Sequence, residues 1–290
     1  MKFAIKRGMN QRTLKENLSF EGVGIHSGTF AKILLHPERE DTGIRFLKDR
    51  VYIPANFRFV VSTDHSTDLG KDGVVIKTVE HLMAVLYMLG VDNVTIEFVK
   101  GFEVPILDGS GYYFYKFLKD NVINLNAPAS IVEIKHSFEV RNCKANIKAI
   151  PYQGFSAVYV GGLEGFFEER SVEFNGNVKD LVFARTFCYD YELKHLINRG
   201  LAKGGSLKNA LLLGRGFVYN RGGLRSEDEP LRHKLLDLIG DLALFGRRIK
   251  GRVISHKGGH TLNHQFVVGL ESFLSNLSDT TFTSSSVSTP

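Results

Sequence analysis

The stretch PLRHKLLDLIGDLALFG, residues 230–246, decides which fold we expect. Its leucine, isoleucine and phenylalanine residues cover most sides of a helix, which indicates a helix buried in a protein core. Pro230 suits the first turn, where its missing N–H donor is not needed, and the acids at 227–229 complement the positive end of the helix dipole. After Gly246, the run RIKGRVISH at 248–256 is typical of a strand. This stretch therefore predicts a buried helix, a glycine and a strand.

The same order of helix, glycine and strand occurs earlier in the chain. IKTVEHLMAVLYMLG, residues 76–90, has apolar residues at helical spacing and ends on Gly90, and a strand is expected at 94–99. Sliding one copy onto the other places His81 over Asp237. A duplicated α+β domain would explain this repeat.

The segment NLNAPAS, residues 124–130, has the composition of a linker and precedes a strand-like run at 131–140. We therefore expect an N-terminal domain over residues 1–128 and a C-terminal domain over 129–275. The Ser/Thr-rich residues 276–290 are expected to form a disordered tail. Further strands are expected at 29–36 and 43–46, and further helices at 112–120 and 191–199, with a glycine-rich loop leading into an apolar segment over 200–214.

The composition is that of an ordinary globular protein, with 43% hydrophobic and 23% charged residues in a chain of 290. The sequence contains no apolar run of the roughly 20 residues that a membrane span needs, and its first residues lack the features of a signal peptide. We expect a cytoplasmic protein without a transmembrane segment. Its two cysteines, Cys143 and Cys188, form no CxxC pair and are expected to be reduced.

The formal net charge of +6 leaves three kinds of partner to consider: nucleic acid, an anionic membrane surface and an anionic small molecule. Lysine and arginine occur in ones and twos, mixed with acids, and form no basic stripe with interleaved aromatic residues. This distribution favours a small polyanionic ligand over nucleic acid. An effect on solubility alone is the remaining interpretation.

Polar residues interrupt the apolar helix at 230–246 in a regular way. His233, Asp237 and Asp241 stand at i, i+4 and i+8, and so lie on nearly one face. Burying these groups without partners would cost several kcal/mol each, and a metal ion is a natural partner for imidazole and carboxylate together. The alternative is a solvent-facing stripe, which is the commoner meaning of an isolated HxxxD.

The other helix carries Glu80 and His81 side by side. Adjacent residues differ by about 100° around a helix, so one could bind a metal while the other reaches a water molecule, as in zinc hydrolases. A helix-opening glutamate is the simpler explanation of the pair alone. In KGGHTLNH, His260 follows two glycines and is either a mobile loop residue or a second acid–base group. The spacings of a P-loop, an HExxH zinc motif and a dinucleotide fingerprint are all missing from the sequence.

With these residues identified, the chain resembles the UDP-3-O-acyl-N-acetylglucosamine deacetylase family from about residue 11 to residue 265. The resemblance rests on several long segments in the family's order: QRTLKENLSFEGVGIHSG, TDHSTDLG, IKTVEHLMAVLYMLGVDNVTIE, PILDGSG, ARTFCYDYE, GLAKGGSLKNALLL, LRSEDEPLRHKLLDLIGDL and KGGHTLNH. It implies an α+β fold of two similar domains, each with a sheet packed against a pair of helices, and an active site between them.

The same resemblance implies the roles of the site residues. His81, His233 and Asp237 would bind zinc, which iron could replace, Glu80 would be the general base and His260 the general acid.

The resemblance also implies a supporting set of residues. Lys234 and Thr186 would stabilise the oxyanion, and Asp241 would orient His260. Residues 191–213 would build an apolar passage for an acyl chain. Three further positions are similar to family positions that contact the substrate: Phe187, Lys257 and Gly205.

The implied function is hydrolysis of the N-acetyl group of UDP-3-O-acyl-N-acetylglucosamine, an early step of lipid A synthesis. The expected partner is this small molecule, with its UDP head and fatty acyl chain, and not nucleic acid or an obligate protein. Two alternatives stay open: a zinc deacetylase of another amidated sugar, and a non-catalytic binder of nucleotide sugars.

Overall fold

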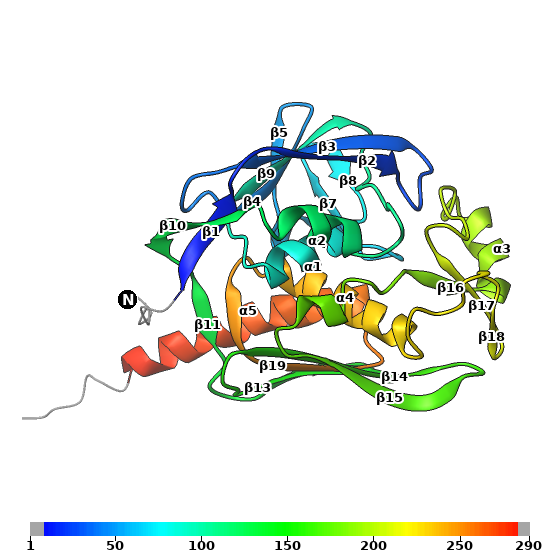
Figure 1. The fold of residues 1–290 in the computed structure, drawn as a ribbon. Coiled ribbons are helices and arrows are strands. Elements are labelled where there is room, and N and C mark those ends of the chain that lie inside the picture. Colours follow the sequence, from blue (N-terminus) through cyan, green and yellow to red (C-terminus); the bar gives the residue numbers. More distant parts are fainter. Residues whose placement is uncertain (1–8, 284–290) are drawn as a thin grey trace, which may run out of the picture.

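The chain folds into an α+β structure in which two sheets enclose a layer of helices (Figure 1). The computed structural model describes residues 9–283. The sheet from the first half of the chain has the strand order β2-β3-β9-β4-β5. Its strands are β2 (Leu18–Val23), β3 (Phe30–Pro37), β4 (Ile44–Lys48), β5 (Val51–Pro54) and β9 (Val94–Lys100). The predicted α+β class and the strands expected near 29–36, 43–46 and 94–99 are confirmed.

The sheet from the second half repeats this order as β12-β13-β19-β14-β15. In each sheet the central strand, β9 or β19, runs antiparallel to one neighbour and parallel to the other. The strands are β12 (Phe138–Arg141), β13 (Asn146–Ile150), β14 (Phe155–Leu163), β15 (Phe167–Phe174) and β19 (Arg248–His256), with β11 (Ile131–Glu133) paired to β19. The two halves are therefore similar, as the helix–glycine–strand repeat predicts, whereas the domain bounds at residues 128 and 275 remain predictions.

Helices from both halves lie between the two sheets (Figure 1). They are α1 (Glu80–Met88), α2 (Tyr112–Leu118), α4 (Glu229–Ala243) and α5 (His260–Thr283). A further helix, α3 (Asp190–Asn198), projects at one end together with β16 (Phe187–Tyr189), β17 (Leu211–Gly214) and β18 (Phe217–Val218). We call residues 187–218 the insert. The helices expected at 112–120, 191–199 and 230–246 correspond to α2, α3 and α4.

Short strands and turns complete the fold. β1 (Asn10–Leu14) pairs with β10 (Val122–Pro128), and β6 (Val60–Ser62), β7 (Asp68–Lys71) and β8 (Val74–Ile76) form a small sheet ahead of α1. Two 3-10 turns, η1 (Phe57–Phe59) and η2 (Val178–Asp180), connect larger elements.

The crossing of α1 and α4 determines where the polar residues of the two helices meet. Almost every residue of both helices is buried, as the apolar composition of each helix predicts. Gly240 of α4 lies directly against the backbone of Glu80, because a Cβ atom added at Gly240 would come within 2.7 Å of the Glu80 carbonyl carbon. The two helices can therefore approach closely at this point.

The structure corrects two predictions in the first half. The helix expected over residues 76–90 begins only at Glu80, because Ile76 belongs to β8 and Thr78 has a positive φ of 58°, which a right-handed helix excludes. The linker expected at 124–130 is largely strand β10, since its backbone pairs with β1 over residues 122–128.

Three predictions in the second half are also corrected. The single strand expected over 131–140 is divided into β11 and β12. His260 is the first residue of α5 and not a residue of a mobile glycine turn. Helix α5 continues to Thr283, so residues 276–283 are helical where a disordered tail was expected; residues 284–290 of that tail lie outside the described residues.

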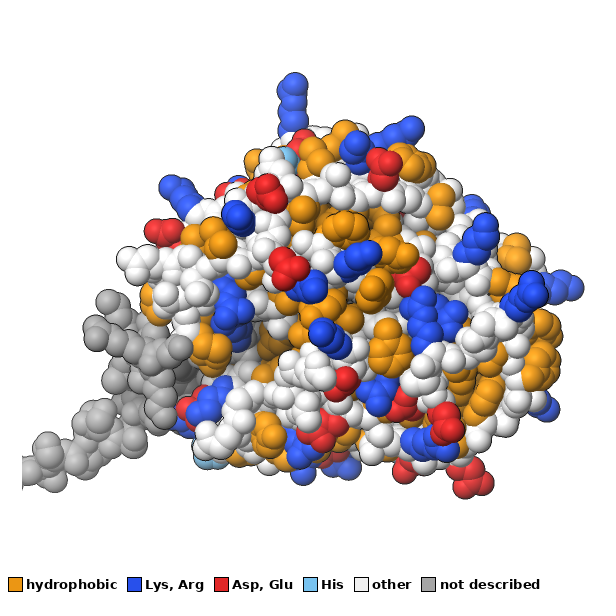
Figure 2. Space-filling view, viewed as in Figure 1, with side chains coloured by type: hydrophobic (Ala, Val, Ile, Leu, Met, Phe, Trp, Pro, Cys, Tyr) orange, Lys and Arg blue, Asp and Glu red, His pale blue; other side chains and the backbone are white. Residues whose placement is uncertain are grey.

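Figure 2 shows lysine and arginine side chains scattered over one face of the molecule and interspersed with acidic ones, in agreement with the mixed charge pattern of the sequence. Within residues 9–283, no helix combines the length and the apolar character required to span a membrane.

Candidate active site

Three side chains with metal-binding atoms converge where α1 crosses α4. His81 comes from α1, and His233 and Asp237 are one turn apart on α4. All three are buried, and their ligand atoms lie within 4.8 Å of one another. Asp237 Oδ1 lies 3.3 Å from His233 Nε2 and 3.5 Å from His81 Nε2. The structure thus brings these three residues together, and their role as metal ligands stays a prediction.

The hydrogen-bonding pattern of this cluster suits a cation. His233 Nδ1 lies 3.0 Å from the carbonyl oxygen of Ala184, which can only accept, so Nδ1 carries the proton and Nε2 presents a lone pair. Burial lowers the pKa of His233 to about 3, so the ring is neutral. Asp237 Oδ1 is buried and accepts no hydrogen bond from any residue in 9–283. A carboxylate oxygen and a nitrogen lone pair facing each other without a donor are the arrangement that a bound metal ion satisfies.

The charges around Asp237 keep it ionised. Burial alone would raise its pKa, but the positive charges of Lys234 and His260 oppose burial, and the pKa is held well below the usual value. Lys234 Nζ lies 3.3 Å from Asp237 Oδ2 and sits over the ring of Phe187 at 5.5 Å. A cationic side chain and an aromatic ring therefore border the cluster on the side of the insert.

Glu80 and His260 face each other beside the cluster. Glu80 Oε1 lies 3.9 Å from His260 Nε2, and both residues are buried. Burial raises the pKa of Glu80 to about 7. Burial would lower the pKa of His260, but the Asp241 carboxylate reverses this effect and raises the pKa to about 9. A carboxylate able to take a proton and a histidine that holds one thus stand opposite each other.

Asp241 organises the far side of His260. Its Oδ2 accepts from His260 Nδ1 at 2.8 Å and from Asn263 Nδ2 at 2.8 Å. Its Oδ1 accepts from Thr67 Oγ1 at 2.6 Å, and the Thr67 N–H donates to Glu80 Oε2 at 3.0 Å. Thr67 and Asn263 lie in the segments TDHSTDLG and KGGHTLNH, where no local pattern marks them as site residues. Only contacts between distant segments distinguish them from ordinary polar residues.

The remaining predicted residues are Thr186, Phe187, Lys257 and Gly205. Thr186 immediately precedes β16, and its N–H donates to the carbonyl oxygen of Gly109 at 2.7 Å. The Phe187 ring contacts the ring of His233 edge-on, with centroids 6.5 Å apart. Lys257 is exposed in the turn before α5, and Gly205 is exposed in the loop between α3 and β17. The structure thus brings Phe187 to the cluster and leaves Lys257 and Gly205 at the surface.

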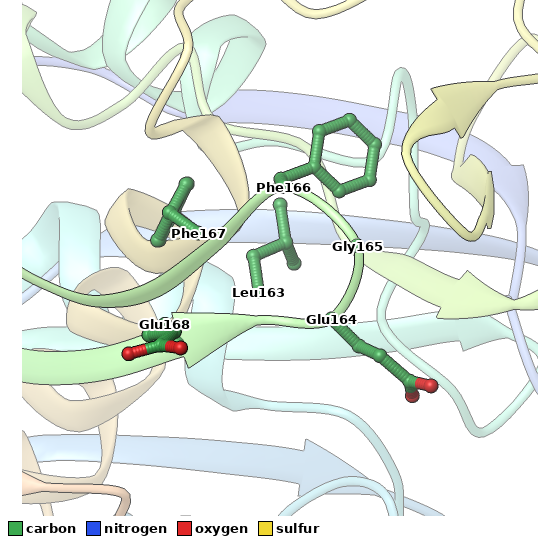
Figure 3. Close-up of a pocket in the computed structure, with 7 residues that line it drawn as sticks. Leu163, Glu164, Gly165, Phe166, Phe167 and Glu168 are labelled. Carbon is green, nitrogen blue, oxygen red and sulfur yellow. The ribbon is translucent and has the colours of Figure 1, made fainter.

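A hollow of about 400 Å³ lies at the turn between β14 and β15, lined by residues 162–168. Figure 3 shows Phe166 and Glu164 extending from this turn in different directions. A second hollow, of about 560 Å³, adjoins it and is bordered by Tyr191 and Phe217 of the insert. Neither hollow is lined by the residues of the His–Asp cluster.

The chain is thus an α+β protein of two similar halves, with a buried carboxylate and a buried histidine facing each other beside a possible metal site. Sequence comparisons identify the family. The sequence profile of UDP-3-O-acyl N-acetylglycosamine deacetylase matches residues 11–272. The chain is 50% identical to the UDP-3-O-acyl-N-acetylglucosamine deacetylase of Aquifex aeolicus, covering 89% of this chain and 91% of the relative.

Two other relatives carry the same name. The protein of Thermodesulfovibrio yellowstonii is 40% identical, covering 89% of this chain and 90% of its own length, and that of Nitratidesulfovibrio vulgaris is 38% identical, covering 91% and 88%. The chain belongs to the UDP-3-O-acyl-N-acetylglucosamine deacetylase family. It is accordingly an enzyme that hydrolyses an amide.

Proposed function

We propose that this protein is a zinc-dependent enzyme that removes the N-acetyl group of UDP-3-O-acyl-N-acetylglucosamine, an early step of lipid A synthesis. The observation that carries the proposal is the convergence of His81, His233 and Asp237 beside the pair of Glu80 and His260. Asp237 Oδ1 accepts no hydrogen bond from the part of the chain that the structure describes. The names of the relatives supply the substrate.

His81, His233 and Asp237 would hold the metal ion, by Nε2 of His233, an imidazole nitrogen of His81 and a carboxylate oxygen of Asp237. When bound there, zinc supplies a Lewis acid for the amide carbonyl and makes water easier to deprotonate. Iron accepts the same donor set, so we propose zinc with iron as a replacement.

Glu80 accepts the proton of the attacking water in this proposal. Its Oε2 is held by the N–H of Thr67, which leaves Oε1 on the side of His260 free to take a proton. Burial brings the pKa of Glu80 to about 7, close to the pH at which a general base is most effective.

His260 donates a proton to the departing nitrogen. The Asp241 carboxylate stabilises the protonated ring and directs Nε2 away from itself, toward Glu80. As the C–N bond breaks, the sugar nitrogen takes the proton from Nε2 and leaves as a free amine, and the acetyl carbon leaves as acetate. Lys234, and Thr186 as a hydrogen-bond donor, would stabilise the oxyanion that precedes this break.

We assign the diphosphate end and the acyl end of the substrate to different parts of the protein. The formal charge of +6 favours a diphosphate, and Lys257 and Gly205 would contact the substrate from the surface loops. The insert would receive the acyl chain, with Phe187 between the chain and the cluster. We place the enzyme in the cytoplasm with a small-molecule substrate, without nucleic acid and without an obligate protein partner.

Acetate release tests this function directly. The purified protein is assayed with UDP-3-O-acyl-N-acetylglucosamine and, in parallel, with UDP-N-acetylglucosamine. We expect rapid deacetylation of the acylated substrate only. Equal rates would favour a deacetylase of another amidated sugar, and binding of both without acetate release would favour a non-catalytic binder of nucleotide sugars.

A further inference from the structure

Thr67 lies between Glu80 and His260 and is 1% exposed. Its backbone is attached to the start of α1: the N–H donates to Glu80 Oε2 at 3.0 Å, and the carbonyl oxygen accepts from the Val79 N–H at 3.1 Å. The backbone of Thr67 is therefore held by Glu80, the residue proposed to accept the proton, and by Val79, which precedes Glu80.

The side chain of Thr67 reaches the other half of the molecule. Its Oγ1 donates to Asp241 Oδ1 on α4 at 2.6 Å and lies 3.3 Å from His260 Nδ1 on α5. Within residues 9–283, Thr67 is the residue that donates to this oxygen, because His260 and Asn263 both donate to Oδ2. Thr67 therefore contacts Glu80, the proposed proton acceptor, and also Asp241, the residue that holds the proposed proton donor His260.

Three donors fix the orientation of the Asp241 carboxylate. Rotation of the group would break the short bond from Thr67 and would turn Oδ2 away from His260. Hydrogen bonds to a buried, ionised carboxylate are among the stronger ones in proteins, and the branched Thr67 side chain is restricted at χ1. The hydroxyl of Thr67 therefore sets the direction in which Asp241 holds the His260 ring.

We propose that Thr67 is a positioning residue that fixes Glu80 and the Asp241–His260 pair in one arrangement across the two halves. The proposal rests on the proposed deacetylation. Thr67 acts on the reaction through its neighbours, so it affects turnover and leaves the metal ligands and the substrate-binding surfaces unchanged.

The test compares substitutions of this one side chain. Thr67→Val removes the hydroxyl and keeps the backbone N–H that holds Glu80. We expect kcat to fall by about 10- to 100-fold, the usual loss when a partner of this kind is removed, while KM and zinc content stay at the wild-type values. Thr67→Ser restores the hydroxyl and should recover most of the lost turnover.

Thr63→Val is the matched control. Thr63 Oγ1 pairs with Thr261 Oγ1 at 2.9 Å, so it also joins the two halves through a hydroxyl from the same loop. Within residues 9–283, its side chain makes no hydrogen bond to Glu80 or His260. Its kcat should equal that of the wild type. An equal loss of turnover in Thr63→Val would show that any cross-half hydroxyl matters and would overturn the specific role of Thr67.

Two further results would overturn the proposal: a folded, zinc-loaded Thr67→Val enzyme with wild-type kcat, or a Thr67→Ser enzyme as slow as Thr67→Val. If valine prevents folding by placing a methyl group against the Asp241 carboxylate, Thr67→Ala removes the hydroxyl without that contact and must show the same loss of kcat. A wild-type protein without deacetylase activity would instead contradict the proposed function, and the role of Thr67 would fall with it.

Discussion

His260 keeps its proton near neutral pH because nearby carboxylates, above all that of Asp241, raise its pKa against the effect of burial. The carboxylate lies 2.8 Å from Nδ1, and its charge outweighs the burial that would otherwise favour the neutral ring. Glu80 shows the opposite balance, since burial raises its pKa to about 7 despite the nearby histidines. The two groups can therefore be in the required states together, one deprotonated and the other protonated.

This pairing predicts a bell-shaped dependence of kcat/KM on pH. Activity should fall as pH drops below about 7, where Glu80 becomes protonated, and fall again as pH rises above about 9, where His260 loses its proton. The two limbs are apparent values of a coupled site. Asp241→Asn should shift the basic limb to lower pH and reduce turnover, because the amide no longer stabilises the protonated ring. A pH profile of the wild type and the variant measures both effects.

His260→Ala tests whether His260 is the group that donates the proton. The variant should lose turnover by about 10² or more and should keep its metal, because His260 is not among the proposed ligands. If it kept the basic limb and near-normal turnover, another group would have to donate the proton, and Glu80 serving as both base and acid would be the obvious substitute.

The contact between α1 and α4 depends on a residue without a side chain. At Gly240 the backbone of α4 packs directly against the backbone of Glu80 in α1. This contact sets the distance of Glu80 and His81 from Asp237. Gly240→Ala should separate the helices, lower the free energy of unfolding by about 1–3 kcal/mol and weaken zinc binding. Thermal unfolding and zinc titration measure the two effects.

Gly222→Ala is the control, since a Cβ atom at Gly222 meets nothing within 4 Å. It should leave stability and zinc affinity unchanged. Wild-type zinc affinity in a Gly240→Ala protein would mean that the spacing of the two helices does not control the metal site.

The insert is the element to which we assign the acyl chain. Its exposed apolar side chains include Ile197, Leu207 and Phe217, whereas Leu211 and Leu213 of β17 pack in the protein core. If the chain lies against apolar side chains, each methylene should contribute roughly 0.8 kcal/mol. Shortening the chain by four carbons should then lower kcat/KM by two orders of magnitude or more, and equal efficiencies for acylated and unacylated sugars would contradict the assignment.

The sequence predicted the elements whose pattern is local. The central strands and α4 follow from alternation, helical spacing and flanking residues, and β19 has the predicted bounds of residues 248–256. The start of α1 was misplaced because nothing in IKTV signals the left-handed conformation of Thr78. β10 was taken for a linker because its pairing with β1, over a hundred residues away, leaves no local pattern.

The residues of the candidate site were likewise predictable only where a local pattern marks them. The spacing of His233 and Asp237 indicated a shared face, and the repeat aligned His81 with Asp237 before any fold was known. Thr67 and Asn263 could not be found this way, because their contacts form only when the residue before β7 and helices α4 and α5 come together. His260 was identified by resemblance, but its helix was not predicted because two glycines precede it.

The repeat of the two halves explains why the cluster lies where it does. Each half supplies one central helix, and the two helices pack closely against each other. At their crossing, α1 contributes one candidate metal ligand and α4 contributes two. Both helices are followed by a glycine with positive φ, 67° at Gly90 and 74° at Gly246, and then by the central strand of a sheet. A metal ion bound here would therefore join the two halves as well as serve the reaction.

Reconstitution with zinc tests this account most directly. The protein is stripped of metal, its fold is checked, and zinc is titrated while acetate release from UDP-3-O-acyl-N-acetylglucosamine is followed. We predict that one equivalent of zinc per chain restores activity in the wild type and in His136→Ala, an exposed histidine outside the cluster. His81→Ala should bind zinc weakly and lose turnover by orders of magnitude. A metal-free protein with full activity, or a His81→Ala protein with full zinc and full turnover, would contradict the account.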